Sequence, residues 1–321
     1  KDNKKDITRE IKNEIRAIKN VGGKIVYTDE FSSSSSKLIN SYLDVLNPDQ
    51  KIFINKLKKY SSNFSEYFQK FRKLNVLVIG ETIIDHYFFC DILGKSGKDP
   101  ILAIKENFDQ KYVGGSASIA INLSKFWKKI NFVTAIGSNK EDLKFLKSKL
   151  TKNVNLQNII DHQKPTITKK RFVDEISNTK LLSVYNIEDS YMSMKNRQKL
   201  FNLIKKNIKK NDLVIVSDYG HGLIDSKIAD YICKNAKFLA VNAQINAANR
   251  GYHSLTNYRK KNNLIIVNEN ELRHEMRDSR SDIKILMKKF SKMNNFKDLI
   301  ITRGSMGAIL YNRNSKKFFT S

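Results

Sequence analysis

Cysteine and proline are scarce in this sequence, which has two of the former and three of the latter among 321 residues. Cys90 and Cys233 lie far apart and match no metal-binding spacing, so a disulfide-rich scaffold and a cysteine-based zinc site are excluded. We expect both to be reduced thiols of a cytoplasmic protein. The few prolines, together with abundant asparagine, isoleucine and lysine, indicate AT-rich codons.

Long apolar runs are also absent. No stretch approaches the roughly 18 apolar residues that a membrane-spanning helix needs, and residues Lys1–Lys5 are not followed by the apolar core of a signal peptide. The sequence has no initiator methionine, and Ser321 directly follows a strand-like run. We therefore expect a cytoplasmic protein whose sequence is cut at both ends.

The charge is strongly positive, with a formal net value of +27 at pH 7. A basic surface can bind nucleic acid because binding releases counterions from the phosphates. The lysines, however, are spread along the whole chain and form no basic stripe interleaved with aromatic residues, which is the usual footprint of such proteins. We therefore interpret the charge as a codon effect and expect small-molecule partners rather than nucleic acid.

Three segments differ in pattern. Residues 1–46 contain a helical repeat of isoleucines, a Gly22-Gly23 break, a short strand pattern at Lys24–Thr28, the serine run Ser32–Ser36 and a second helical pattern at Leu38–Leu46. Residues 47–73 are rich in Lys, Phe and Tyr and are typical of a linker helix. Residues 74–321 alternate apolar strands with amphipathic helices and form the large domain.

The large domain is predicted to be α/β, with a doubly wound, mostly parallel sheet covered by helices on both faces. The expected strands are Asn75–Ile79, Phe132–Ile136, Leu213–Ser217, Phe238–Asn242, Leu264–Val267 and Leu299–Thr302. The expected helices lie near 115–128, 139–150, 192–209, 226–236 and 281–294. Ligands of such sheets bind at the carboxyl ends of the strands, so polar residues there are candidate site residues.

Two stretches, Asp99–Lys111 and Thr166–Tyr185, break this rhythm. Both alternate apolar and polar residues, as half-exposed antiparallel strands do. They predict a small accessory sheet, which is either a lid over an active site or a dimer interface.

Several polar residues follow strands or precede helices. Asp85, five residues after Gly80, either accepts hydrogen bonds from sugar hydroxyls or caps a turn. Gly114-Gly115 either admit a ligand to the backbone at a helix N-terminus or form a tight turn. Asp218 closes a strand and is either a site residue or a loop cap, whereas His221 is interpreted as a solvated loop residue.

Two later motifs have the composition of a phosphate or metal site. Asn268 and Glu271 lie on one face of a helix start, where they either orient metal-bound water and phosphate or form a capping box. Small and basic residues after the last strand either contact a nucleotide phosphate or form a hairpin turn: Thr302, Arg303, Gly304 and Gly307.

Taken in order, these motifs resemble those of the ribokinase-like (pfkB-type) carbohydrate kinases. The series is Gly80-Glu81 with Asp85, Gly114-Gly115, Pro165-Thr166-Ile167-Thr168-Lys169, Ser217-Asp218-Tyr219, Asn268-x-x-Glu271 and Thr302-Arg303-Gly304. It covers residues 74–321 and is most similar to the kinase domains of bifunctional heptose kinase/nucleotidyltransferase enzymes. The resemblance implies ATP and Mg²⁺ as cofactors, a sugar or sugar phosphate (a heptose phosphate above all) as substrate, and accessory strands that form a lid or a homodimer contact.

The resemblance also implies residue roles. The sugar would be bound by Asp85, Gly114, Gly115, Ser118, Lys169 and Asp218. The nucleotide would be contacted by Asn268, Glu271, Thr302, Arg303, Gly304 and Gly307, with Glu271 serving Mg²⁺ through water. The Gly-Ala-Gly-Asp motif that supplies the family's catalytic base does not occur here, so we expect the base beyond Ser321 and an inactive fragment.

Two positions depart from the family pattern. Ser118 stands where the family usually has Asn, and Asn242-Ala243 stands where a strand usually ends in Asp-Pro. These departures leave a non-catalytic sugar- or nucleotide-binding homologue as the alternative function.

Residues 1–46 have a resemblance of their own, to the C-terminal tail of a cytidylyltransferase-like nucleotidyltransferase. It rests on Gly22-Gly23-Lys24-Ile25-Val26 and on the run from Ser33 to Ile39. In that family a serine cluster at a helix start contacts nucleotide phosphates. A plain serine-rich linker is the alternative.

Overall fold

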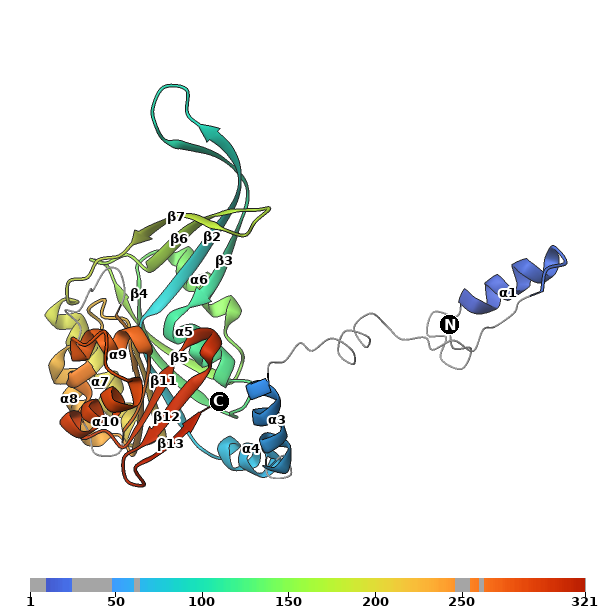
Figure 1. Cartoon of the computed structure of the whole chain (residues 1–321). Helices are drawn as coiled ribbons and strands as arrows, with labels where there is room; N and C mark the ends of the chain where they lie inside the picture. Colours follow the sequence, from blue (N-terminus) through green and yellow to red (C-terminus); the bar gives the residue numbers. More distant parts are fainter. Residues whose placement is uncertain (1–9, 25–47, 61–63, 246–254, 260–262, 321) are drawn as a thin grey trace. The chain divides into compact units, whose positions relative to one another are not determined.

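The computed structural model describes residues 10–24, 48–60, 64–245, 255–259 and 263–320. The chain forms two compact units, residues 1–62 and 63–321 (Figure 1). In the first unit, the isoleucine-rich helix is α1 (Glu10–Asn20), and it ends at glycines as predicted. Gly22 has a φ of 74°, and the Gly23 N–H bonds to the carbonyl of Ile18. The strand, the serine run and the second helix expected before residue 47 lie outside the described residues, apart from Lys24.

The expected linker helix is two helices, α3 (Pro48–Tyr60) in the first unit and α4 (Phe64–Arg72) in the second. Aromatic residues attach α4 to the second unit. The ring of Phe68 stacks on Phe126 and that of Phe71 on Trp127, with centroids 5.6 Å and 5.9 Å apart. Helix α4 therefore packs as part of the second unit, and the assignment of residues 47–73 to a linker stays a prediction.

A sheet of nine strands forms the core of the second unit, in the order β13-β12-β11-β10-β9-β8-β1-β4-β5. The strands are β1 (Val76–Gly80), β4 (Ile130–Gly137), β5 (Val154–Asp161), β8 (Leu213–Asp218), β9 (Phe238–Ala243), β10 (Asn263–Asn268), β11 (Asp298–Thr302), β12 (Ala308–Asn312) and β13 (Lys317–Thr320). From β5 to β11 all neighbours are parallel, and β12 and β13 add an antiparallel edge. The predicted mostly parallel sheet is confirmed.

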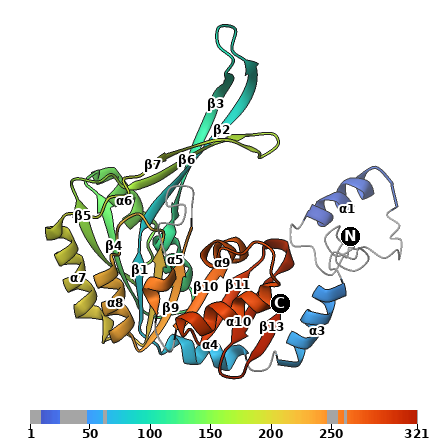
Figure 2. The ribbon, with the colours of Figure 1, turned by 60° about the vertical axis from the view of Figure 1, so that its left-hand side comes forward.

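Helices cover both faces of this sheet (Figures 1 and 2). Because successive strand side chains point to opposite faces, the four fully buried residues of β1 divide between two cores. Leu77 and Ile79 pack with the first core, and Val76 and Val78 with the second. The first core includes residues of α7 (Met194–Ile208), α8 (Ser226–Asn235), α9 (Glu269–Met276) and α10 (Ile283–Asn294), and the second includes residues of α5 (Gly115–Leu123) and α6 (Lys140–Lys149).

A second sheet projects from the carboxyl edge of the first (Figures 1 and 2). It has the order β3-β2-β6-β7 and contains β2 (Thr82–Lys95), β3 (Leu102–Gly114), β6 (Ile167–Asp174) and β7 (Lys180–Asn186). We call this four-stranded sheet the lid. Its strands include the two stretches for which the sequence predicted an accessory sheet, so that prediction is confirmed. Within the described ranges, none of the helices has the length and apolar character needed to cross a bilayer.

Candidate functional site

The predicted site residues follow strands that end at one edge of the large sheet. Gly80 at the end of β1 is in register with Ser217 on β8, and Asn268 at the end of β10 is in register with Thr302 on β11. The lid rises from the same edge, because β2 begins two residues after Gly80. Polar residues separated by more than two hundred positions in the sequence therefore share one edge.

Asp85 lies on β2, at the base of the lid, and not at the cap or turn that was the alternative. Its carboxylate forms an ion pair with Arg171 of β6, with 2.5 Å between Oδ1 and Nη1. The other oxygen lies so close to Gly114 that a Cβ at that position would clash with it. Gly114 is therefore required by the Asp85 carboxylate itself.

Gly115 begins α5 in a left-handed conformation with a φ of 61°. A Cβ there would clash with the carbonyl oxygen of Glu81, which also accepts bonds from the N–H and the hydroxyl of Ser116. Ser118 lies in the first turn of α5 and is half-buried. The Gly-Gly pair therefore joins the lid, the end of β1 and the start of α5.

A cationic, aromatic-walled surface forms the part of the lid around Asp85. Lys169 and Arg171 alternate along β6 and therefore share one face of the lid. The Lys169 ammonium lies 5.6 Å from the ring of Tyr185 and 5.7 Å from that of Tyr219, and the Arg171 guanidinium lies 5.2 Å from the ring of Tyr87. Burial lowers the pKa of Lys169, and the charge of Arg171 acts in the same direction.

Two buried carboxyl groups lie beneath this surface, on Glu81 and Asp218. Burial, with the nearby charge of Asp218, raises the pKa of Glu81 to about 7. The Glu81 carboxylate accepts the N–H groups of Tyr219 and His221 at 3.0 Å and 3.2 Å. Asp218 accepts a hydrogen bond from the hydroxyl of Tyr258, whose pKa burial raises well above its usual value. No role was assigned to Glu81 or Tyr258 from the sequence. Glu81 could have been identified as a candidate site residue, because it is an acidic residue directly after a buried strand.

The interpretation of His221 as a solvated loop residue is wrong. Its side chain is buried, and its Nδ1 lies 2.8 Å from a carboxylate oxygen of Asp189. Burial lowers the pKa of the imidazole, and the contact with Asp189 opposes this effect. The sequence carried no sign of it, because the partner comes from a segment 32 residues earlier.

Asn268 and Glu271 form the capping box that was one of their two interpretations. The Glu271 N–H donates to Asn268 Oδ1 at 2.8 Å, and the Asn268 N–H donates to Glu271 Oε2 at 2.7 Å. Glu271 is buried, and burial raises its pKa. The described residues contain no group of three or more His, Cys, Asp or Glu side chains arranged to hold a metal. The Glu271 carboxylate accepts main-chain hydrogen bonds from Asn268 and Ile245. A Mg²⁺ ion that keeps several waters and binds mainly to nucleotide phosphates fits this buried carboxylate only through one of its waters.

The segment after β11 is the hairpin turn to β12, which was the alternative to a phosphate loop. Arg303 is not free in this turn, because its Nε lies 2.7 Å from Glu269, which also binds Arg273 at 2.7 Å. Gly304 has a φ of 59° and no atom within 4 Å of the position a Cβ would take. The backbone at Gly304 is therefore open to a ligand, while the charge of Arg303 is already paired.

Tyr219 links the lid side of the edge to the α9 side. Its pKa is raised mainly by burial, and the charges of Glu81, Asp85 and Glu271 raise it further. Asp85 and Glu271 therefore both lie near enough to Tyr219 for their charges to act on its side chain.

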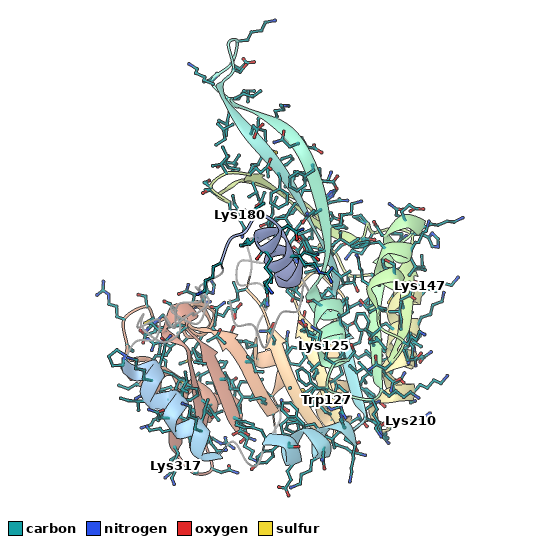
Figure 3. All side chains as sticks on the ribbon, turned by 90° about the vertical axis from the view of Figure 1, so that its right-hand side faces the viewer. Lys125, Trp127, Lys147, Lys180, Lys210 and Lys317 are labelled. Atoms are coloured by element: carbon teal, nitrogen blue, oxygen red, sulfur yellow. The ribbon has the colours of Figure 1, made fainter. Side chains whose placement is uncertain are left out.

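The lysines labelled in Figure 3 lie on or next to different elements: Lys125 after α5, Lys147 on α6, Lys180 on β7, Lys210 after α7 and Lys317 on β13. The interpretation of the charge as a codon effect stays a prediction.

Comparisons with known proteins agree with the motif series. The profile of the pfkB family carbohydrate kinases matches residues 73–321. A bifunctional protein HldE from Aliarcobacter butzleri is 26% identical over 224 residues, which are 64% of this chain and 45% of the relative. HldE of Campylobacter jejuni strain RM1221 is 27% identical over 170 residues, 53% of this chain and 35% of the relative. The chain therefore spans less than half the length of these curated relatives, and the resemblance of residues 1–46 to a nucleotidyltransferase stays a prediction.

Solved structures show the same fold at low identity. Phosphofructokinase-2 from Escherichia coli in complex with fructose-6-phosphate has a TM-score of 0.60 and 10% identity, covering 77% of this chain and 79% of that chain. Ribokinase from Giardia lamblia has a TM-score of 0.58 and 18% identity, covering 77% and 74%. These likenesses establish the ribokinase-like α/β fold.

Proposed function

The chain belongs to the pfkB family of carbohydrate kinases, and from this premise we propose that its site phosphorylates a hydroxyl group of a sugar phosphate, with a heptose phosphate favoured. ATP is the proposed phosphoryl donor. The observation that carries the proposal is the pair of cations Lys169 and Arg171 on the lid face that also holds Asp85. The HldE relatives support a heptose as the sugar.

The sugar is proposed to lie between the base of the lid and the start of α5. Asp85 would accept hydrogen bonds from sugar hydroxyls, and Gly114 and Gly115 would let the sugar approach the backbone. Asp85 is given an orienting role rather than that of a base, because one of its carboxylate oxygens is already paired with Arg171. Ser118 and Asp218 complete the proposed set, with Asp218 acting through Tyr219 because its own carboxylate is buried.

An anionic group on the substrate explains the two cations. Arg171 is paired with Asp85, whereas Lys169 forms no ion pair with any other described residue, although the charge of Asp85 acts on it. The rings of Tyr185 and Tyr219 exclude water from that ammonium, which strengthens its attraction for a phosphate. A neutral sugar would leave this charge unused.

The nucleotide is proposed to lie on the α9 side, over Asn268, Thr302 and Gly304. The open backbone at Gly304 and the turn glycine Gly307 would contact phosphate, with Arg303 held in place by Glu269. Mg²⁺, when bound, would neutralise charge on the transferred phosphoryl group. Glu271 would orient water on that ion while it continues to cap α9.

Calorimetric titration tests the proposal directly. Sedoheptulose 7-phosphate should bind the protein at least about tenfold more tightly than sedoheptulose, because two charge-assisted contacts are added. Equal affinity for the two sugars would contradict an anionic substrate. Failure of both sugars and of ATP to bind would contradict the kinase site itself.

A non-catalytic binding homologue is the alternative, and Asn242 favours it. Its side chain donates to the carbonyl of Ile266 at 2.8 Å and accepts from Gln244 at 3.0 Å, so it is used within the fold. Tight binding of sugar phosphate and ATP without formation of ADP, in a clone that extends past Ser321, would favour the binder.

A further inference from the structure

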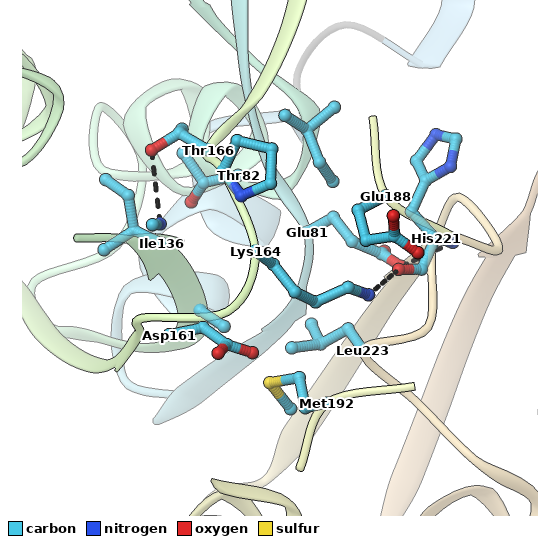
Figure 4. Close-up of a pocket in the computed structure, with 14 residues that line it drawn as sticks. Glu81, Thr82, Ile136, Asp161, Lys164, Thr166, Glu188, Met192, His221 and Leu223 are labelled. Atoms are coloured by element: carbon cyan, nitrogen blue, oxygen red, sulfur yellow. Dashed lines mark hydrogen bonds between the residues drawn. The ribbon is translucent and has the colours of Figure 1, made fainter. Parts of the chain in front are cut away.

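A pocket next to the proposed site contains the side chain of Lys164, which has no role in the mechanism above (Figure 4). This pocket lies at the carboxyl ends of β1, β4 and β5. The pocket has a cavity volume of about 40 Å³. That space suits a few waters or a small ion, and it is too small for a sugar.

The Lys164 ammonium is surrounded by oxygen atoms. It donates to the main-chain carbonyl of Ser190 and, at 3.2 Å, to that of His221. Asp161, which also lines the pocket, is buried and has one carboxylate oxygen with no hydrogen-bond partner among the described residues. Burial lowers the pKa of Lys164, and the charges of Asp161 and Glu188 oppose this effect. Carbonyl oxygens with carboxylates nearby are the surroundings that proteins provide for a bound monovalent cation.

The two carbonyls belong to different parts of the molecule. Ser190 lies in the segment that leaves the last lid strand, β7, and leads to α7, whereas His221 lies in the loop after β8. Two further contacts hold these segments together. Asp189 binds His221, and Gly222, with a φ of 83°, lies so close to Ser190 that a Cβ would clash with the Ser190 carbonyl.

We propose that Lys164 is a positioning residue: its ammonium is a tethered cation that occupies a monovalent-cation site and fixes the base of the lid to the loop after β8. That loop contains Tyr219, whose ring contacts Lys169 of the lid. The contact made by Lys164 thereby sets the distance between the lid cation and the edge of the sheet. Its consequence for sugar phosphate binding rests on the proposed function, but the cation site itself does not.

Replacement of Lys164 by methionine tests the site. Hydrogen exchange of the amides in residues 188–193 and 219–223 should become about tenfold faster in Lys164→Met, since hydrogen bonds from a charged donor are lost. Ammonium or potassium chloride should restore slow exchange, because the small cation can enter the vacated space. Tetramethylammonium chloride at the same ionic strength should not, because this cation is too large for the vacated space.

Two outcomes would overturn the proposal: unchanged exchange in Lys164→Met, or faster exchange that neither ammonium nor potassium reverses. Lys147→Met, on the exposed surface of α6, is the matched control and should respond to none of these salts. If Lys164→Met does not fold, Lys164→Gln provides the same comparison with a neutral hydrogen-bond donor. Loss of slow exchange with cation rescue, in a protein that binds no sugar phosphate, would support the cation site and refute only the proposed function.

Discussion

Asp85 and Arg171 form an ion pair between neighbouring strands of the lid, with 2.5 Å between the carboxylate and the guanidinium. Both side chains are mostly buried, at 24% and 17% exposed, so water screens the pair less than it would at the surface. The two side chains have different proposed partners on the substrate. Asp85 would accept hydrogen bonds from sugar hydroxyls, and Arg171 would bind the phosphate group.

Arg171→Met is therefore expected to weaken binding of sedoheptulose 7-phosphate by about 10- to 100-fold, as the loss of a charge-assisted bond predicts. Binding of unphosphorylated sedoheptulose should change much less. Calorimetric titration measures both affinities. Lys170→Met is the control, because Lys170 is exposed and points to the opposite face of β6. Equal losses for the two sugars would mean that Arg171 holds the fold and not a phosphate.

Gly114→Ala should displace the Asp85 carboxylate. The added methyl group would clash with it, and such overpacking costs about 1–3 kcal/mol of unfolding free energy. Urea denaturation measures the loss, and binding of the sugar should fall with it. Gly97→Ala is the control, since a Cβ there meets no atom within 4 Å. Unchanged stability and affinity in Gly114→Ala would show that the two groups do not touch in solution.

How far these relationships could be predicted differs along the chain. β1, β8, β10 and β11 were predictable because they contain continuous apolar runs in which no residue before the last position of the strand is exposed. β2 was not predicted, because aromatic residues on both of its faces remove the alternation of apolar and polar residues that identifies a half-exposed strand. Phe88 stacks on Phe172 and Phe89 on Phe108, with centroids 5.0 Å and 4.7 Å apart.

The order of the motifs predicted which residues would lie at the edge, but it could not predict their partners. The ion pair of Asp85 depends on the register of β2 with β6, and the burial of His221 depends on a segment from the far side of the lid. Such contacts arise from tertiary packing, which leaves no local pattern in a single sequence. β5 was missed for a related reason, since this edge strand mixes buried residues with polar, half-exposed ones.

A second copy of the chain is expected to pack on the lid. Leu182 and Val184 on β7 are 56% and 47% exposed and are in register with Phe172 and Lys170, on the lid face away from Asp85. Light scattering after gel filtration should give a dimer, and Leu182→Lys should shift it toward the monomer. The exposed residue Met293 on α10 provides the control Met293→Lys. A monomer at all concentrations would contradict the prediction.

Removal of Mg²⁺ is expected to weaken ATP binding through Glu271. Chelation by EDTA should lower the ATP affinity of the unaltered protein by about tenfold, because the ion shields the phosphate charge. In Glu271→Gln most of this Mg²⁺ effect should vanish while stability is kept, since Gln also caps a helix at this position. Fluorescence titration with and without EDTA measures the difference. Glu106→Gln, on an exposed part of β3, should retain the full Mg²⁺ effect.

Glu81 makes stability depend on pH in a direction opposite to that of most carboxylates. Its pKa is about 7 in the folded protein, against an ordinary value of 4.5, because burial and Asp218 disfavour its charged form. Between these two values the folded state binds more protons than the unfolded state, so the free energy of unfolding falls as the pH rises. The full loss across the window is about 3–4 kcal/mol.

Urea denaturation at about pH 5 and about pH 8 measures this slope. Glu81→Gln should flatten it, because the amide does not ionise, although its single carbonyl oxygen can accept only one of the two N–H groups, of Tyr219 and His221, that the carboxylate accepts. The exposed Glu66→Gln should leave the slope unchanged. A variant that lacks the Glu81 carboxyl and still loses stability over the same pH range would assign the effect to a different group. Asp218, the buried acid whose charge acts on Glu81, would be the next to replace.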